Sequence, residues 1–275
     1  MLFLWHLVRI LYRRAIKMAV LDFTYNMSIK FSMPVVKHCY TLRCIPLECE
    51  NQHIEDIKVT VFPENELTYS NDGFGNILVT DRIVTMHNEF TVDVSGTVTT
   101  GAHITPENDL NPVYKYPTHF TKCGAELQKM FDRIQVGISD DAVDTALKFT
   151  RAIRANIVYK SGSTSVITTA EEALLNGAGV CQDYSHILLA LLRKAGMPCR
   201  YVVGMMVGEG ETHAWVEVYY NGSWHGVDPT NNRLADENYI IISRGRDFAD
   251  CGINRGLLTG GGMQTQSVSL KVTKR

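Results

Sequence analysis

The sequence lacks the features that mark several common classes of protein. It has no run of about 20 consecutive apolar residues, the length that a helix needs to cross a bilayer, so we expect no integral membrane segment. Its formal net charge is only −2, which gives no electrostatic basis for a nucleic-acid partner. The three glycines at 260–262 are not followed by the Lys and the Ser or Thr of a phosphate-binding loop, so we interpret them as a flexible turn near a cleft.

The cysteines give no sign of a zinc site. The chain has seven of them, an odd number. Six show no short paired spacing of the kind that zinc ligation requires: Cys39, Cys44, Cys49, Cys123, Cys199 and Cys251. Reduced, buried thiols in a cytoplasmic protein are the simplest interpretation. We therefore expect no metal and no cofactor.

The first 28 residues are expected to form a loosely attached extension. Residues 1–8 are apolar and basic residues follow them, whereas a secretory signal places its positive charges first. Two other interpretations remain open. The extension could precede a true start near Met18 or Met27, or it could be a basic amphipathic helix that lies on a membrane.

The rest of the chain divides into three parts. Residues 29–100 predict an antiparallel β-sandwich-like domain, in which 72–76 (Asp-Gly-Phe-Gly-Asn) is interpreted as a hairpin turn. Residues 101–138 contain several prolines and are predicted to connect this domain to the next. Residues 139–275 are predicted to form the core domain with strands at its C-terminal end. The β-rich runs of the first domain lie at 35–45, 54–62, 77–85 and 89–98.

The core domain combines helices and strands that need each other's apolar surfaces. Capped helices are predicted from Ser139 and from Thr168 or Thr169, and a third helix begins near Cys181. Strand-like runs follow at 201–207, 213–220 and 223–227. We expect the helices to pack on a sheet formed by these strands, which makes the fold class α+β.

Cys181 lies between a glycine-rich turn and the first turn of the third helix. Unpaired backbone N–H groups and the positive end of the helix dipole favour a thiolate at this position, and the thiolate is the nucleophilic form. A cysteine alone would be weak evidence, because free cysteine is most often a small buried apolar residue. The interpretation therefore depends on the partners that the strands supply.

The pair Asn221-Gly222 predicts a two-residue hairpin that brings a histidine close to an aspartate. If this turn sets the register, Tyr220 faces Ser223 and Trp215 faces Asp228. His213 then lies diagonal to Asp228 on the same side of the sheet. Cysteine, histidine and aspartate are the nucleophile, the general base and the orienting group of an acyl-transfer site.

Other arrangements of these residue types are possible. His186 lies about 140° round the helix from Cys181, and His225 has the opposite strand parity from His213, so we assign both to structural roles. A zinc site made of Cys181, His213 and Asp228 remains an alternative, because all three residue types ligate zinc.

Three blocks of sequence resemble the core of the bacterial transglutaminase-like superfamily, whose members are often named as cysteine proteases. The blocks are 179–186 (GVCQDYSH), 212–217 (THAWVE) and 224–230 (WHGVDPT), in this order. The resemblance implies a papain-like core, with helices on an antiparallel sheet and with Cys181, His213 and Asp228 as the catalytic triad. The stretches 42–46 and 72–76 also resemble the N-terminal β-domain of the bacterial members.

The residues and the resemblance together predict a thiol-dependent acyl-transfer enzyme. We expect it to hydrolyse peptide, isopeptide or amide bonds in a peptide or protein substrate. Gln182, Tyr159 and Trp215 are the candidates for binding the oxyanion or lining the cleft. Two alternatives remain open, a protein-glutamine transamidase and a non-catalytic, peptide-binding member of the family.

Overall fold

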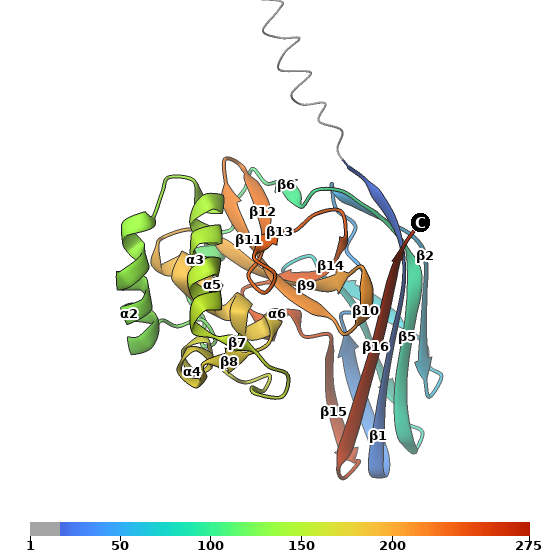
Figure 1. The fold of residues 1–275 in the computed structure, drawn as a ribbon. Coiled ribbons are helices and arrows are strands. Elements are labelled where there is room, and N and C mark those ends of the chain that lie inside the picture. Colours follow the sequence, from blue (N-terminus) through green and yellow to red (C-terminus); the bar gives the residue numbers. More distant parts are fainter. Residues whose placement is uncertain (1–16) are drawn as a thin grey trace, which may run out of the picture.

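The computed structural model describes residues 17–275, so the predictions for residues 1–16 lie outside it. Within this range the helices pack on one face of a smaller sheet, and a larger sheet lies at the end of the molecule away from the helices (Figure 1). Both sheets are antiparallel, and the predicted α+β class is confirmed. None of the helices in the described range is long and apolar enough to cross a membrane.

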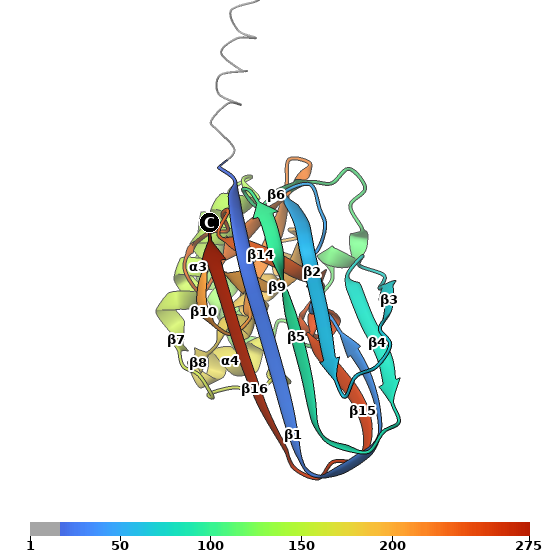
Figure 2. The ribbon, with the colours of Figure 1, turned by 90° about the vertical axis from the view of Figure 1, so that its right-hand side faces the viewer.

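The larger sheet is built around one long strand, β1 (Ala19–Leu42). The first half of β1 pairs with β5 and β16, and the second half pairs with β4 and β15 (Figure 2). Within residues 17–275 the strands that join β1 in this sheet are β2 (Gln52–Phe62), β3 (Thr68–Asn71), β4 (Ile77–Ile83), β5 (His87–Thr100), β10 (Gly208–Gly210), β15 (Asn254–Gly260) and β16 (Gln264–Lys274). The predicted sandwich-like strands thus belong to one continuous sheet.

The extension predicted for residues 1–28 is shorter than expected, because β1 already begins at Ala19. The reason is a period-2 pattern of apolar residues over positions 19–27. Side chains at alternate positions are almost fully buried: Ala19, Leu21, Phe23, Tyr25 and Met27. This alternation is the pattern of a strand with one face on a core.

The C-terminal strands do not close the core domain but return to the larger sheet. β15 and β16 both pair with β1. The turn between them, at 260–262, contacts Ser32, Met33 and Pro34 at the far end of the sheet, away from the helices (Figure 1). We expected this turn near a cleft, and that expectation was wrong. Because β16 runs along β1, the turn that precedes it lies at the far end of the sheet.

The smaller sheet confirms the predicted hairpin. Tyr220 pairs with Ser223, and the turn residues Asn221 and Gly222 have φ angles of 48° and 76°. Within the described residues the strands of this sheet are β6 (Ile104–Pro106), β9 (Cys199–Met206), β11 (His213–Tyr220), β12 (Ser223–Asp228), β13 (Arg233–Leu234) and β14 (Tyr239–Gly245).

The helices lie together on the outer face of the smaller sheet. They are α2 (Ala125–Ile134), α3 (Ala142–Asn156), α4 (Ala170–Asn176), α5 (Cys181–Lys194) and α6 (Phe248–Cys251), with short 3-10 segments η1 (Pro112–Lys115) and η2 (Gln135–Gly137). The predicted capping box of α4 is present, with Thr169 and Glu172 bonding each other's backbone N–H groups. Three of these elements, η1, α2 and η2, lie in the stretch 101–138 that was predicted to be a simple connection.

Strand alternation assigns the residues of β11 to two different cores. Ala214, Val216 and Val218 pack against the helices. His213, Trp215 and Glu217 project to the opposite face, where Trp215 packs with Leu47, Tyr239 and Ile241. The two sheets are fastened together at Asn76, whose side chain makes two hydrogen bonds of 2.7 Å to the backbone of Arg244.

Candidate active site

Cys181 is the first residue of α5, as predicted, and its side chain is partly exposed. The backbone N–H of the preceding residue, Val180, donates to Oδ2 of Asp183 at 2.7 Å. The hydroxyl of Thr164 donates to the same oxygen at 2.6 Å. Burial raises the pKa of Asp183. These bonds fix the start of the helix and hold the cysteine at a helix N-terminus, where the dipole favours a thiolate.

His213 and Asp228 meet as the hairpin register predicts. Nε2 of His213 lies 2.8 Å from Oδ2 of Asp228. The carboxylate is completely buried, and the imidazole side chain is 14% exposed. Behind the imidazole, the ring of Trp215 stacks at a centroid distance of 6.2 Å with 26° between the planes. The histidine is therefore held on two sides while one edge remains accessible.

Four further hydrogen bonds converge on the carboxylate of Asp228. Oδ1 accepts the backbone N–H groups of Thr230 and Asn231 at 2.9 and 3.1 Å. Oδ2 accepts the Asn231 side-chain amide and the Tyr239 hydroxyl, both at 2.7 Å. Burial alone would raise the pKa of Asp228, but these bonds and His213 outweigh it and lower the pKa. Asp228 is thus an ionised carboxylate with every lone pair engaged.

Asn231 and Tyr239 are the supporting residues that sequence reasoning missed. The run Asp228-Pro229-Thr230-Asn231 carried a usable signal, because an aspartate followed by proline often accepts backbone N–H groups two and three residues on. Tyr239 carried none. It begins β14, which pairs with β9, so its position beside Asp228 depends on a pairing between distant strands.

Cys181 interacts with the free edge of the same imidazole. Because Nε2 is bound to Asp228, the nitrogen that remains for the thiol is Nδ1. Burial works to lower the pKa of His213, but hydrogen bonding to Asp228 and Cys181, together with their charges, outweighs it and raises the pKa to about 9. A positively charged imidazole beside a cysteine is the environment that stabilises a thiolate.

The three other candidate residues have different surroundings. Gln182 donates its side-chain amide to the backbone oxygen of Val166 at 3.2 Å. Tyr159 is 54% exposed and lies opposite Gly179 in the short pairing of β7 (Val158–Tyr159) with β8 (Ala178–Gly179), two residues before Cys181. Trp215 is fully buried, so it supports His213 from behind instead of lining the cleft. Strand parity gave the correct side for Trp215, but Leu47, Tyr239 and Ile241 pack against it there.

The two other histidines considered as the base, His186 and His225, make structural contacts to the backbone. Nε2 of His186 accepts the backbone N–H of Phe248 at 3.2 Å, and burial, with Arg193 nearby, lowers the pKa of His186 to about 3. Nε2 of His225 lies 3.3 Å from the backbone oxygen of Tyr220. Within residues 17–275, no group of three or more His, Cys, Asp or Glu side chains is arranged to hold a metal ion.

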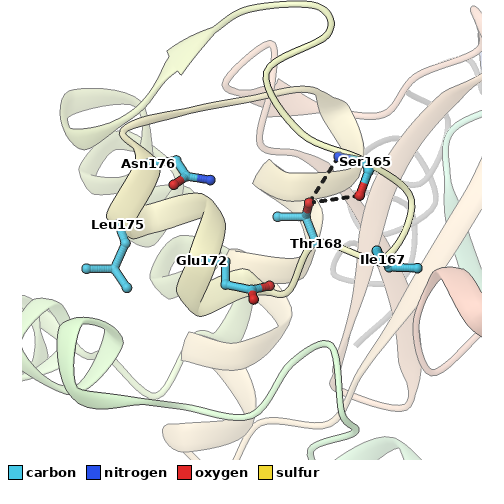
Figure 3. A pocket seen from close by; sticks show the side chains of 6 residues that line it. All are labelled: Ser165, Ile167, Thr168, Glu172, Leu175 and Asn176. Atoms are coloured by element: carbon cyan, nitrogen blue, oxygen red, sulfur yellow. Dashed lines mark hydrogen bonds between the residues drawn. The ribbon is translucent and has the colours of Figure 1, made fainter.

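A separate hollow of about 390 Å³ lies beside the start of α4. Its lining side chains come from α4 and from the loop before it (Figure 3). The hydroxyl of Thr168 accepts the N–H of Ser165 at 3.0 Å, and Glu172 belongs to the capping box of α4. Since these polar groups serve the turn and the helix cap, this hollow offers no chemistry of its own.

Comparison with known proteins gives two matching families. Residues 128–229 match the transglutaminase-like superfamily, and residues 21–99 match the bacterial transglutaminase-like N-terminal region. An uncharacterized protein of Mycobacterium bovis is 31% identical over 223 residues, which cover 69% of this chain and 71% of that protein. An uncharacterized protein of Mycobacterium leprae is 36% identical over 134 residues, which cover 45% of this chain and 48% of that protein.

A solved structure shares the whole architecture. The crystal structure of a "putative cysteine protease" from Cytophaga hutchinsonii aligns with a TM-score of 0.79 over 94% of this chain and 91% of that chain. The two sequences are 22% identical. At this identity the likeness shows a common fold alone.

Proposed function

The chain belongs to the transglutaminase-like superfamily and carries the N-terminal region of its bacterial members, and from this premise we propose that it is a thiol-dependent acyl-transfer enzyme. Cys181 is the nucleophile, His213 its acid and base, and Asp228 the group that orients the imidazole. The observation that carries the proposal is the 2.8 Å contact between His213 and Asp228, next to a thiol at the first turn of α5.

The proposed reaction begins with the proton of the thiol on His213, which its raised pKa favours. The sulfur of Cys181 attacks the carbonyl carbon of an amide, a C–S bond forms, and the carbonyl oxygen becomes an oxyanion that the backbone N–H of Cys181 stabilises. His213 gives its proton to the nitrogen, the C–N bond breaks and the amine leaves. A thioester on Cys181 remains.

Water completes the cycle in the form of the reaction that we favour. His213 takes a proton from a water molecule, the hydroxide oxygen attacks the thioester, and the C–S bond breaks to return the thiolate and release a carboxylic acid. An amine in place of water would give transamidation, but that outcome requires water to be excluded. The partly exposed position of Cys181 supports hydrolysis.

The test is a screen of the full chain against libraries of peptides, isopeptides and glutamine amides, with and without added amines. We expect free carboxylic acids as products and no turnover by Cys181→Ala. A matched control is Cys39→Ala, which removes an exposed thiol on β1 and should leave turnover unchanged. Turnover that survives in Cys181→Ala would refute the proposal, and amide products in the presence of amines would favour transamidation.

We also propose a cytoplasmic location, because all seven cysteines are free. A thiol reagent that does not cross membranes should label the exposed Cys39 only after the cells have been lysed. Labelling in intact cells would place the protein outside the cytoplasm.

A further inference from the structure

A second, smaller hollow opens directly beside His213. It has a volume of about 150 Å³ and is lined by residues 206–211, His213 and Leu270. Residues 206–211 include β10, which pairs with β16 of the larger sheet (Figure 1). The hollow therefore lies where the N-terminal β-rich sheet reaches the site, and it ends at the imidazole that gives and takes protons in the proposed reaction.

The charges around this hollow leave one carboxylate without a counterion. Oε1 of Glu209 lies 2.9 Å from Nζ of Lys271, so these two charges compensate each other. His213 is compensated by Asp228. Glu211 is exposed, and among residues 17–275 no basic side chain lies within ion-pair distance of it. The hollow therefore carries one net negative charge, contributed by Glu211.

Glu211 also lies within electrostatic reach of the residues around the reactive sulfur. Tyr159 is the exposed aromatic residue next to the start of α5. Burial raises the pKa of Tyr159, and the charges of Cys181 and Glu211 raise it further. Tyr159 thus lies within electrostatic range of both the thiol and the carboxylate of Glu211.

The position of the hollow decides which half of a substrate it can hold. In amide cleavage the histidine must lie within hydrogen-bond reach of the departing nitrogen, so the amine side of the scissile bond lies at His213. Among the described residues the lining includes His213 but not Cys181, which bonds the acyl side. The hollow therefore suits the amine-side half.

Resting on the proposed function, we propose that this hollow binds the amine-side half of the substrate and that Glu211 selects a cationic group there, an ammonium or a guanidinium. Glu211 is thus a specificity-determining residue. Within the described residues, β10 is an edge strand of the larger sheet. A Cβ atom added at Gly208 (φ 131°) would have no other heavy atom within 4 Å. This open edge leaves room for an extended chain to lie along β10.

The test uses symmetric disulfides, whose departing thiol carries the charge of interest. The full chain is treated with cystamine, bis(hydroxyethyl) disulfide or dithiodipropionate, which carry cationic, neutral and anionic ends respectively. Mass spectrometry of the digested protein measures the rate of mixed-disulfide formation at Cys181. Each rate is divided by that of free cysteine with the same reagent, which removes the intrinsic reactivity of the reagent.

We expect the normalised rate for cystamine to exceed that for the neutral disulfide by roughly fivefold, the effect of one partly exposed charge pair. Glu211→Gln should abolish this preference, and Glu211→Lys should reverse it in favour of dithiodipropionate. Glu66→Gln removes an exposed carboxylate beside β3, at the opposite edge of the same sheet, and should change nothing.

The preference and the absolute rate answer different questions. Equal normalised rates for the three disulfides, or a cystamine preference that persists in Glu211→Gln, would overturn the assignment of the hollow. A rate at Cys181 no faster than that of free cysteine would count against the proposed function. If Cys181 reacts no faster than free cysteine but still prefers cystamine, and Glu211→Gln removes that preference, the assignment of the hollow stands and the catalytic proposal fails.

Discussion

Tyr239 donates its hydroxyl hydrogen to the same oxygen of Asp228 that bonds His213. The two contacts are 2.7 and 2.8 Å long, and they join side chains from β11, β12 and β14 on one face of the smaller sheet. The tyrosine therefore helps to fix the oxygen that the imidazole bonds. This arrangement connects the strand order of the smaller sheet to the chemistry of the site.

Tyr239→Phe should destabilise the fold and raise the pKa of Asp228. A hydrogen bond to a charged acceptor contributes about 1.5–3 kcal/mol, so we expect a loss of that size in the free energy of unfolding at neutral pH. Because the bond helps to lower the pKa of Asp228, its stabilising effect is present above the ordinary pKa of the carboxyl group and is lost as the pH falls through the lowered value. The acid-unfolding midpoint of the variant should therefore move to higher pH.

The matched control for this variant is Tyr219→Phe. The Tyr219 hydroxyl donates to the neutral backbone oxygen of Glu107 at 2.7 Å, so its loss should cost about 1 kcal/mol and leave the acid midpoint near that of the wild type. Denaturant unfolding at pH 7 and acid titration followed by circular dichroism measure both effects. Equal losses in the two variants, with equal acid midpoints, would show that Tyr239 has no special relation to Asp228.

His213 should titrate near pH 9, well above an ordinary histidine. The value follows from its hydrogen bonds and charge interactions with Asp228 and Cys181, which outweigh the effect of burial. Since this pKa is raised on folding, the stabilisation that it provides is complete below the ordinary pKa of 6.5 and is lost as the pH rises through about 9. Asp228→Asn removes the negative charge and should move the titration of His213 to lower pH.

An NMR titration of histidine-labelled protein measures this pKa, and His213→Gln assigns the signal. His225 provides an internal comparison on the neighbouring strand. A wild-type midpoint for His213 below pH 7, or one that Asp228→Asn leaves in place, would contradict the charge arrangement described for the site.

Glu217→Gln should be one of the most damaging single changes in the smaller sheet. Glu217 is fully buried, and its carboxylate lies 2.5 Å from Nε of Arg200 and 3.0 Å from Nη2 of Arg244. Removing its charge leaves two buried guanidinium groups uncompensated, at a cost of about 3–5 kcal/mol. Denaturant unfolding measures this loss. Asp144→Asn, which breaks an exposed pair with Lys148, should change stability far less, and similar effects of the two variants would argue against the buried cluster.

The parts of the site that the sequence could predict depend on short-range signals. Asn221-Gly222 set the hairpin register, and that register alone brought His213 to Asp228. The first turn of α5 followed in the same way from the glycines and the apolar stripe around Cys181. Each of these predictions needed only residues that are neighbours along the chain or across a tight turn.

The parts that could not be predicted depend on pairings between distant strands. Tyr239 reaches Asp228 because β14 pairs with β9. The last strand, β16, pairs with the first strand, β1. The turn at 72–76 was interpreted correctly as a turn, but nothing local showed that Asn76 would bond the backbone of Arg244. Likewise, parity placed Trp215 on the side of His213 without showing that Leu47, from the segment between β1 and β2, packs on that side.

The most direct test of the account is the rate at which iodoacetamide alkylates Cys181 at pH 6, compared with free cysteine. A thiol at a helix N-terminus beside His213 is expected to be a stronger nucleophile than the thiol of free cysteine, so we expect Cys181 to react at least about tenfold faster. His213→Gln should return the rate to that of free cysteine. A wild-type rate equal to that of free cysteine, unchanged by His213→Gln, would contradict the central claim that these two side chains form a reactive pair.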